Sequence, residues 1–363
     1  MPETTTSIGP LRLQSGAVLP RVDVAFAHYG RLAEDGGNAV LVTHGYTASH
    51  RMLAHGDGVA EGSWAPLIGP GKVLDTDRYF IVCSNMLGSS YGTTGPASTD
   101  PATGRRYGAD FPAFTLADIV EVQHRLLAQL GVRRLRCVVG PSYGGFQALQ
   151  WAVDHADMVD SIGVIVSAPY LPPSEHMDLP RLEAALAAAP AHGGVEATLK
   201  RLRIATMQAY GMEEVLAARG LSPAEREQAI DVMSGRWAQE FDADSLVALL
   251  RAAVVFDLRR HLDRVGCRVL HVVASTDKLF PPDQAVQADM AGIRGPCRYL
   301  EMQTPFGHQA SGPAHALWSG ALRELLEGAE GAGAAGAPSH QEAGAPGRLP
   351  FGGAGPGRNH PAA

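Results

Sequence analysis

Short apolar runs alternate with amphipathic segments along most of the chain. A continuous apolar run of this kind is typical of a strand that is buried on both faces of a parallel sheet. On this pattern we expect strands at residues 39–43, 79–84, 135–140, 161–167, 268–274 and 298–302. Ahead of them, residues 11–29 predict a hairpin that turns near Ser15 and Gly16.

Helical periodicity appears between these runs. In the first such segment, Thr115 stands where an N-cap is expected, with Asp118 three residues later, and Gly131 follows the last turn. We expect helices at residues 115–130, 143–155 and 313–327. Strands that alternate with helices in this order predict an α/β protein with a mostly parallel sheet and helices on both faces.

One long interval, residues 172–258, has no strand pattern. It carries helical runs at residues 182–189, 195–210, 223–239 and 244–255. An all-helical insertion between two strands of such a sheet predicts a cap over the end of the sheet that carries the active site. The alternative is a separate helical domain with an unrelated role.

The last 35 residues differ in composition from the rest. Ala, Gly and Pro make up 24 of them, and Leu349 and Phe351 are the large apolar residues. Such a segment cannot bury enough surface to offset its ordering entropy, so residues 329–363 are expected to be disordered. The predicted organisation is therefore a core in two parts, residues 1–171 and 259–328, with the cap at 172–258 between them.

Composition narrows the class of protein. Apolar residues are 45% and charged residues 18% of the 363, which is enough for a sizeable core. The net charge of −7 argues against a nucleic-acid or membrane partner, and no run approaches the length of a membrane span. The four cysteines have no CxxC spacing, and the N-terminal residues do not resemble a secretion signal, so we expect a cytoplasmic protein.

The sharpest chemical motif is Gly140-Pro141-Ser142-Tyr143-Gly144-Gly145. It follows a predicted strand and opens a predicted helix, which is the context of a GxSxG nucleophile elbow. Side chains at Gly140 or Gly144 would collide in so tight a turn, and the helix N-terminus would face the reaction centre. The motif indicates a nucleophilic Ser142, and the alternative is a glycine-rich turn with a capping serine.

A serine nucleophile needs a base, and the base needs an orienting acid, in the chain order Ser, acid, His. Asp277 follows the strand at 268–274, and His308 follows the strand at 298–302 in a Gly-His dipeptide. Ligand-facing groups of open α/β sheets lie at such strand ends. The rival acid, Asp283, is expected to start a helix, and the rival base, His315, to lie on a helix surface.

Acyl transfer also needs two donors for the oxyanion. One is expected to be the backbone N–H of Tyr143, the residue after the nucleophile, and the other that of Tyr46 in the loop after the strand at 39–43. His44 and Gly45 in that loop could instead form only a tight turn.

Longer sequence runs carry a resemblance to a known family, and this resemblance extends over nearly the whole of residues 1–328. The runs are GPG at 69–71, LDTDRYF at 74–80, SNMLG at 84–88, GTTGP at 92–96, YG at 107–108, FP at 111–112 and QALQWA at 147–152. With these runs the chain resembles the homoserine O-acetyltransferase family of the α/β-hydrolase fold. The resemblance implies a triad of Ser142, Asp277 and His308 and an acyl-enzyme formed from short acyl esters.

The chain departs from that family's pattern at a few positions. The resemblance implies an aspartate after the catalytic histidine, where this chain has Gln309, and an arginine where it has Glu240. Arg203 matches the family's cap arginine only loosely. An unpaired buried charge is costly, so a pocket that lacks charged partners is expected to bind a zwitterionic acceptor poorly.

On these departures the sequence predicts a serine esterase for short-chain, acetate-type esters, similar to the ester-hydrolysing branch of the family. Arg203 and Gln309 are its candidate substrate contacts, and no metal or cofactor is expected. The predicted partner is a small-molecule ester, and a homodimer is possible. The alternatives are an O-acetyltransferase that moves an acetyl group from acetyl-CoA to homoserine or another alcohol, and a non-catalytic binding protein.

Overall fold

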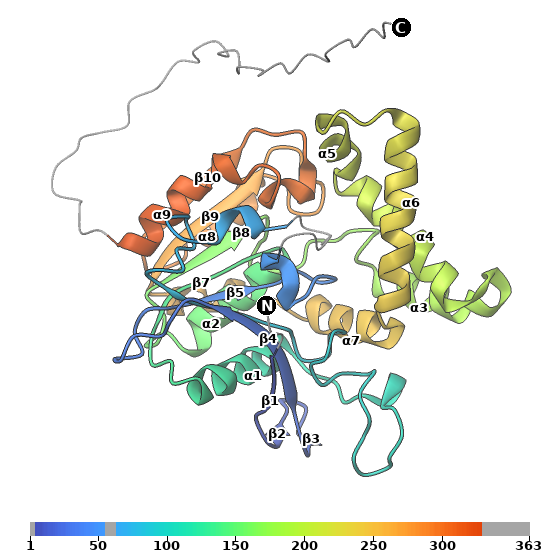
Figure 1. Ribbon diagram of the computed structural model, residues 1–363, viewed down its shortest axis with the longest axis horizontal. Helices are drawn as coiled ribbons and strands as arrows, with labels where there is room; N and C mark the ends of the chain where they lie inside the picture. Colours follow the sequence, from blue (N-terminus) through green and yellow to red (C-terminus); the bar gives the residue numbers. More distant parts are fainter. Residues whose placement is uncertain (1–3, 55–62, 329–363) are drawn as a thin grey trace, which may run out of the picture. The chain divides into compact units, whose positions relative to one another are not determined.

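The computed structural model of the protein describes residues 4–54 and 63–328 (Figure 1). Within them, eight strands form one sheet in the order β1-β4-β6-β5-β7-β8-β9-β10, in which β6 to β10 are parallel and β1 and β4 are antiparallel to their neighbours. The strands are β1 Thr4–Ser7, β4 Asp23–Tyr29, β5 Ala39–Thr43, β6 Phe80–Ser84, β7 Leu135–Pro141, β8 Ser161–Ile165, β9 Arg268–Ala274 and β10 Cys297–Met302. The mostly parallel sheet is confirmed, and the predicted strand limits hold to within two residues.

The predicted hairpin at 11–29 is shorter than expected. Strands β2 (Leu11–Arg12) and β3 (Val18–Leu19) form a separate two-stranded sheet around a turn in which Gly16 has φ +86°. Strand β4 instead joins the main sheet between β1 and β6. Its apolar residues Val24 and Phe26 are buried in a core on one face of that sheet.

The central strands bury both faces, so alternate residues enter two different cores. Leu41 of β5 joins the core that contains α1 (Leu116–Gln129), α2 (Tyr143–Asp154) and α8 (Gln284–Met290). Val40 and Val42 join the core on the opposite face, which contains α9 (Ser319–Glu327). Helices therefore cover both faces of the sheet, as the alternation of elements predicts.

Helix ends follow local sequence signals in two cases and tertiary contacts in a third. Thr115 and Asp118 form the predicted capping box of α1, and Asp283 caps α8. The helix expected at 313–327 begins only at Ser319. Ahead of it the buried Trp318 packs against Trp64, with ring centroids 5.2 Å apart, and donates its indole N–H to the carbonyl of Ser311 at 2.9 Å. These contacts keep the stretch in short 3-10 turns.

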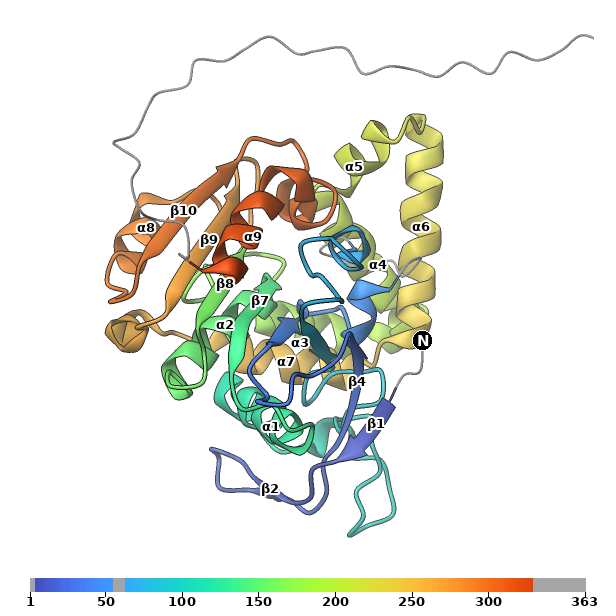
Figure 2. The same cartoon turned by 60° about the vertical axis from the view of Figure 1, so that its left-hand side comes forward.

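Five helices lie between β8 and β9, and Figures 1 and 2 both show α4 and α6 side by side at one edge of the molecule. They are α3 Leu179–Ala187, α4 Gly194–Ala209, α5 Met212–Ala218, α6 Pro223–Glu240 and α7 Ala243–Val254. We call these helices the cap. The pattern missed α5, which has only seven residues and starts after Gly211 at φ +93°.

The cap has a small apolar core of its own, formed by Met207, Met212, Val215, Leu216 and Ile230. Other cap residues join the larger core beside the sheet, among them Leu246, Leu249 and Leu250 of α7. Residues 329–363, for which we predicted a disordered tail, lie outside the described part of the chain. Within the described part, no helix has the length and hydropathy needed to cross a bilayer.

Candidate active site

Ser142 occupies a strained turn between β7 and α2. Its φ is +55° and its ψ is −121°, a region that non-glycine residues rarely adopt. The backbone N–H of Ser142 donates to the carbonyl of Ile165 at 2.9 Å, and its own carbonyl accepts from the Ser167 hydroxyl at 2.7 Å. These two bonds hold the strained backbone of Ser142 in place, and this residue lines a cavity.

The glycines around Ser142 are required by close backbone contacts. A Cβ atom at Gly140 would lie 2.2 Å from the carbonyl oxygen of Thr43, and one at Gly144 would lie 2.4 Å from the same atom. The Thr43 hydroxyl also donates to the carbonyl of Gly144 at 2.8 Å. The end of β5 is therefore pressed against the turn, and no side chain fits between them.

We expect Gly144→Ala to destabilise the protein by about 1–3 kcal/mol, because the backbone of β5 must move to admit the methyl group. Chemical denaturation would measure the free energy of unfolding. Gly320→Ala is the matched control, since a Cβ atom there meets nothing within 4 Å and the position is helical. Equal stability of Gly144→Ala and the wild type would contradict this account of the turn.

Asp277 and His308 form a buried pair. Nδ1 of His308 lies 2.8 Å from Oδ2 of Asp277, and both side chains are almost fully buried. The other carboxylate oxygen of Asp277 accepts from the backbone N–H groups of Leu279 at 2.8 Å and Phe280 at 3.1 Å. Both oxygens are thus engaged, and the carboxylate is oriented toward the imidazole.

The loop that carries His308 is held between the sheet and the cap. Gly307 has φ +53°, and its N–H donates to the hydroxyl of Thr276 at 3.0 Å. On the cap side, the N–H of Gln309 donates to the carbonyl of Tyr210 at 3.0 Å. A Cβ atom at Gly211 would lie 2.3 Å from the carbonyl oxygen of the residue before Gly307, so cap and loop are in backbone contact.

Two aromatic rings connect the surroundings of Ser142 with those of His308. Tyr210 lines a cavity together with Ser142, and its ring centroid lies 4.9 Å from that of His308. The ring of Phe280 lies 5.6 Å from His308 and 5.8 Å from Phe146 in the first turn of α2. The structure therefore gathers the three sequence candidates at the carboxyl ends of β7, β9 and β10.

Tyr46 and Tyr143, the candidates for the oxyanion donors, lie side by side. Their rings are stacked with centroids 6.0 Å apart, and their hydroxyls donate to the carbonyls of Leu246 and Leu249 in α7. Burial raises the pKa of both phenols, which keeps them protonated donors. Tyr143 is the first residue of α2, where backbone N–H groups lack acceptors within the helix.

The sequence argument missed the network that holds the loop of Tyr46. His44 is fully buried, and burial lowers its pKa to about 3, so the ring is neutral and its Nε2 accepts from the N–H of Met86 at 3.1 Å. The carbonyl of His44 accepts from the Gln147 amide at 3.0 Å, and Gln147 accepts from Gln123 at 2.6 Å. The signal available in the sequence was a pair of polar residues, Gln123 and Gln147, on helix faces that are otherwise mostly apolar.

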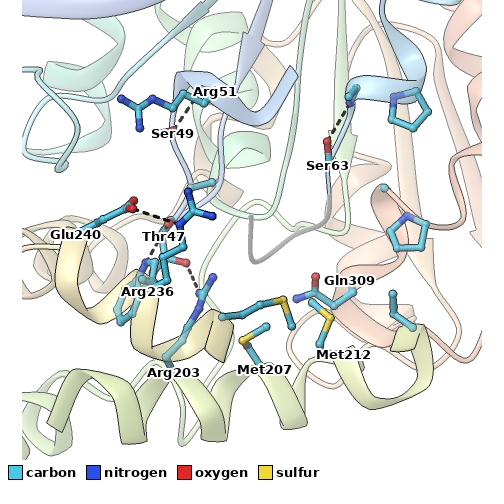
Figure 3. Close-up of a pocket in the computed structure, with 18 of the residues that line it drawn as sticks. Thr47, Ser49, Arg51, Ser63, Arg203, Met207, Met212, Arg236, Glu240 and Gln309 are labelled. Atoms are coloured by element: carbon cyan, nitrogen blue, oxygen red, sulfur yellow. Dashed lines mark hydrogen bonds and ion pairs between the residues drawn. The ribbon is translucent and has the colours of Figure 1, made fainter. Parts of the chain in front are cut away.

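A cavity of about 600 Å³ lies between the cap and the loops that follow β5, β6 and β10 (Figure 3). The buried Arg203 lies at its wall, where its guanidinium donates to the Thr47 hydroxyl at 2.7 Å and lies over the Trp237 ring at 4.9 Å. A second cavity of about 120 Å³ contains Ser142 and is bordered by the same three side chains. The two cavities therefore share the wall that Arg203, Thr47 and Trp237 form.

Gln309 lines the larger cavity beside Met207 and Met212, as Figure 3 shows. Its side chain is fully buried, and neither the amide oxygen nor the amide nitrogen has a hydrogen-bond partner within residues 4–54 and 63–328. A buried polar group without a partner costs about 1–3 kcal/mol. Both atoms also have almost no exposed surface, so a ligand in the cavity would reach them only after the side chain turns toward it.

Glu240, which stands where the resemblance implies an arginine, is half exposed at the rim of the cavity. It lies 3.5 Å from Arg236 one helical turn away, so its charge is partly offset. An exposed, paired carboxylate of this kind has only a weak effect on a carboxylate bound in the cavity.

The chain is similar in sequence to a fold family and, within it, to a group of transferases. Residues 38–293 match the family model described as alpha/beta hydrolase fold. A homoserine O-succinyltransferase of Methylibium petroleiphilum is 35% identical over 89% of this chain and 92% of its own. A homoserine O-acetyltransferase of Moorella thermoacetica is 36% identical over 83% of this chain and 89% of its own.

Solved structures of both transferases and esterases resemble the chain. The homoserine O-acetyltransferase from Bacillus anthracis has a TM-score of 0.78 at 24% identity, covering 90% of this chain and 97% of its own. An acetylester hydrolase from Corynebacterium glutamicum has a TM-score of 0.76 at 26% identity, covering 90% and 96%. Likeness of fold does not separate the two activities, whereas the relatives at higher identity have transferase names.

Proposed function

Because the chain belongs to the homoserine O-acyltransferases, within the α/β-hydrolase fold family, we propose that it transfers a short acyl group from an acyl-coenzyme A thioester to the hydroxyl of homoserine. The observation that carries the proposal is the arrangement of Ser142 in its strained turn with the Asp277–His308 pair nearby. That arrangement suits acyl transfer through a serine ester.

The prediction of an esterase for acetate-type esters is wrong. Relatives 35% and 36% identical over most of their length are named as homoserine acyltransferases. The sequence argument relied on the missing charge at Gln309. An amide oxygen can still accept a hydrogen bond from an ammonium group, and the buried amide of Gln309 has that capacity to spare.

In the first half-reaction, Oγ of Ser142 attacks the thioester carbonyl while Nε2 of His308 takes its proton. Asp277 holds the imidazole in the useful tautomer and stabilises the imidazolium. The N–H groups of Tyr46 and Tyr143 bind the oxyanion. The thiolate of coenzyme A leaves with the proton from His308, and the acyl group remains on Ser142.

In the second half-reaction, the hydroxyl of homoserine attacks the acyl-serine, and its proton passes through His308 back to Ser142. The buried guanidinium of Arg203 binds the carboxylate of homoserine, and the Gln309 side chain turns toward the cavity so that its amide oxygen accepts from the ammonium group. These contacts favour homoserine over water as the acceptor. The cytoplasmic location and a homodimer stay predictions.

The test is an assay of the purified protein with homoserine and either acetyl-CoA or succinyl-CoA, because relatives of both names occur. We expect O-acylhomoserine as the main product. Arg203→Met should raise the KM for homoserine about ten- to a hundredfold, since a hydrogen bond to a charged group contributes about 1.5–3 kcal/mol.

Arg201→Met is the matched control, because Arg201 lies on the same helix with its side chain exposed to solvent. It should leave the KM unchanged. If free carboxylic acid is the main product at saturating homoserine with either donor, the transferase proposal fails.

A further inference from the structure

A cluster of metal-ligating side chains lies on the outer side of α1 and α2, away from the nucleophile. Glu121 and His124 are three residues apart on α1, and His155 is the C-cap of α2. One donor atom from each residue lies within 4.8 Å of the others, and all three side chains are partly buried. Figures 1 and 2 show the two helices side by side.

The positions of the two imidazoles are well defined. Their rings are stacked with centroids 4.3 Å apart, and both lie against the fully buried Trp151. The indole N–H of Trp151 donates to Gln123 at 2.7 Å, which anchors this wall. The backbone N–H of His155 also donates to the carbonyl of Trp151 at 2.9 Å, which fixes the backbone at this end of α2.

The third donor, Glu121, has one oxygen available. Its Oε1 lies 2.6 Å from Arg125, and its Oε2 lies 3.6 Å from Nδ1 of His124. Donor atoms around a tetrahedral zinc ion with bonds of about 2 Å lie about 3.3 Å apart, so small side-chain rotations close the site.

We propose that Glu121, His124 and His155 form a binding site for one divalent transition-metal ion of the zinc type, with water completing the coordination. Two imidazoles and a carboxylate are donors that Zn²⁺ prefers. The ion would join the middle of α1 to the end of α2. Helix α2 has 12 residues and is about 18 Å long, so the ion is remote from Ser142.

The experiment titrates the full-length protein, freed of metal with a chelator, with Zn²⁺ in a calorimeter and follows its thermal unfolding. We expect one equivalent of Zn²⁺ to bind in the wild type and to raise the unfolding temperature. Affinity should fall at least about tenfold in His124→Ala and in His155→Ala. His192→Ala, which removes an exposed histidine of the cap, should bind like the wild type.

A second measurement needs no variant, and therefore does not depend on the folding of one. Co²⁺ added to the metal-free wild type should give the visible absorption bands of a four-coordinate site, and Zn²⁺ should abolish them. Absence of both Zn²⁺ binding and Co²⁺ bands would overturn the proposal, as would binding that both histidine variants leave unchanged. Acyl transfer is expected to be the same with and without Zn²⁺, so the outcome is independent of the proposed function.

Discussion

Ser142→Ala should lower kcat/KM for acyl transfer by about 10³-fold or more, with the protein still folded. Alanine keeps the Cβ atom, so the strained backbone at φ +55° is unaltered, and the change removes only the attacking oxygen. Steady-state kinetics with the acyl-CoA donor and homoserine would measure the loss. Ser161→Ala is the control. Ser161 is also buried, and its hydroxyl donates to the carbonyl of Arg136, but it is the first residue of β8, whereas Ser142 lies beside the last residue of that strand.

Mass spectrometry adds a readout that does not depend on turnover. The wild type incubated with the donor alone should gain the mass of one acyl group, and Ser142→Ala should not. Turnover by Ser142→Ala at a rate near that of the wild type would remove Ser142 from the mechanism.

Asp277→Asn is expected to lower kcat by about 10³- to 10⁴-fold. The asparagine can still accept from the N–H groups of Leu279 and Phe280, so the turn should persist. Its amide nitrogen would then face His308 and favour the wrong tautomer of the imidazole, which could no longer take the proton of Ser142. The measurement is kcat at saturating donor and acceptor.

The matched control for this variant is Asp283→Asn. Asp283 was the rival acid in the sequence, and its Oδ1 accepts from the N–H of Ala285 at 2.7 Å as the cap of α8. Asparagine caps helices about as well as aspartate, so activity should stay at the wild-type value. A large loss in Asp283→Asn with none in Asp277→Asn would reverse the assignment of the acid.

Much of the fold could be predicted because each local signal has one structural solution. The apolar run at β5 is buried on both faces, and a segment with that pattern fits only the interior of a sheet. The capping box of Thr115 and Asp118 satisfies backbone groups within a single turn of helix. Elements governed by contacts distant in the chain were predicted less well. Strand β4 pairs with β1 and β6 and not within the predicted hairpin, and α9 begins six residues later than predicted.

The candidate site divides in the same way. The elbow at Ser142 and the strand-end positions of Asp277 and His308 follow from short sequence spacing. Their convergence depends on the sheet order, and the contact between Asp277 and His308 spans 31 positions in the chain. Sequence spacing alone left Asp283 and His315 as rivals, because it carries no information on which loops meet.

Gln309 shows most plainly what only the tertiary structure decided. In the sequence it is a missing charge, and from that we inferred poor binding of homoserine. In the structure it is a buried amide at the wall of a cavity, and neither polar atom has a hydrogen-bond partner within the described residues. The cost or benefit of a polar side chain depends on its solvation and partners, and these are set by segments far away in the chain, here the cap helices that carry Arg203 and Met212. Glu121, His124 and His155 were likewise inconspicuous until the packing of α1 on α2 brought them together.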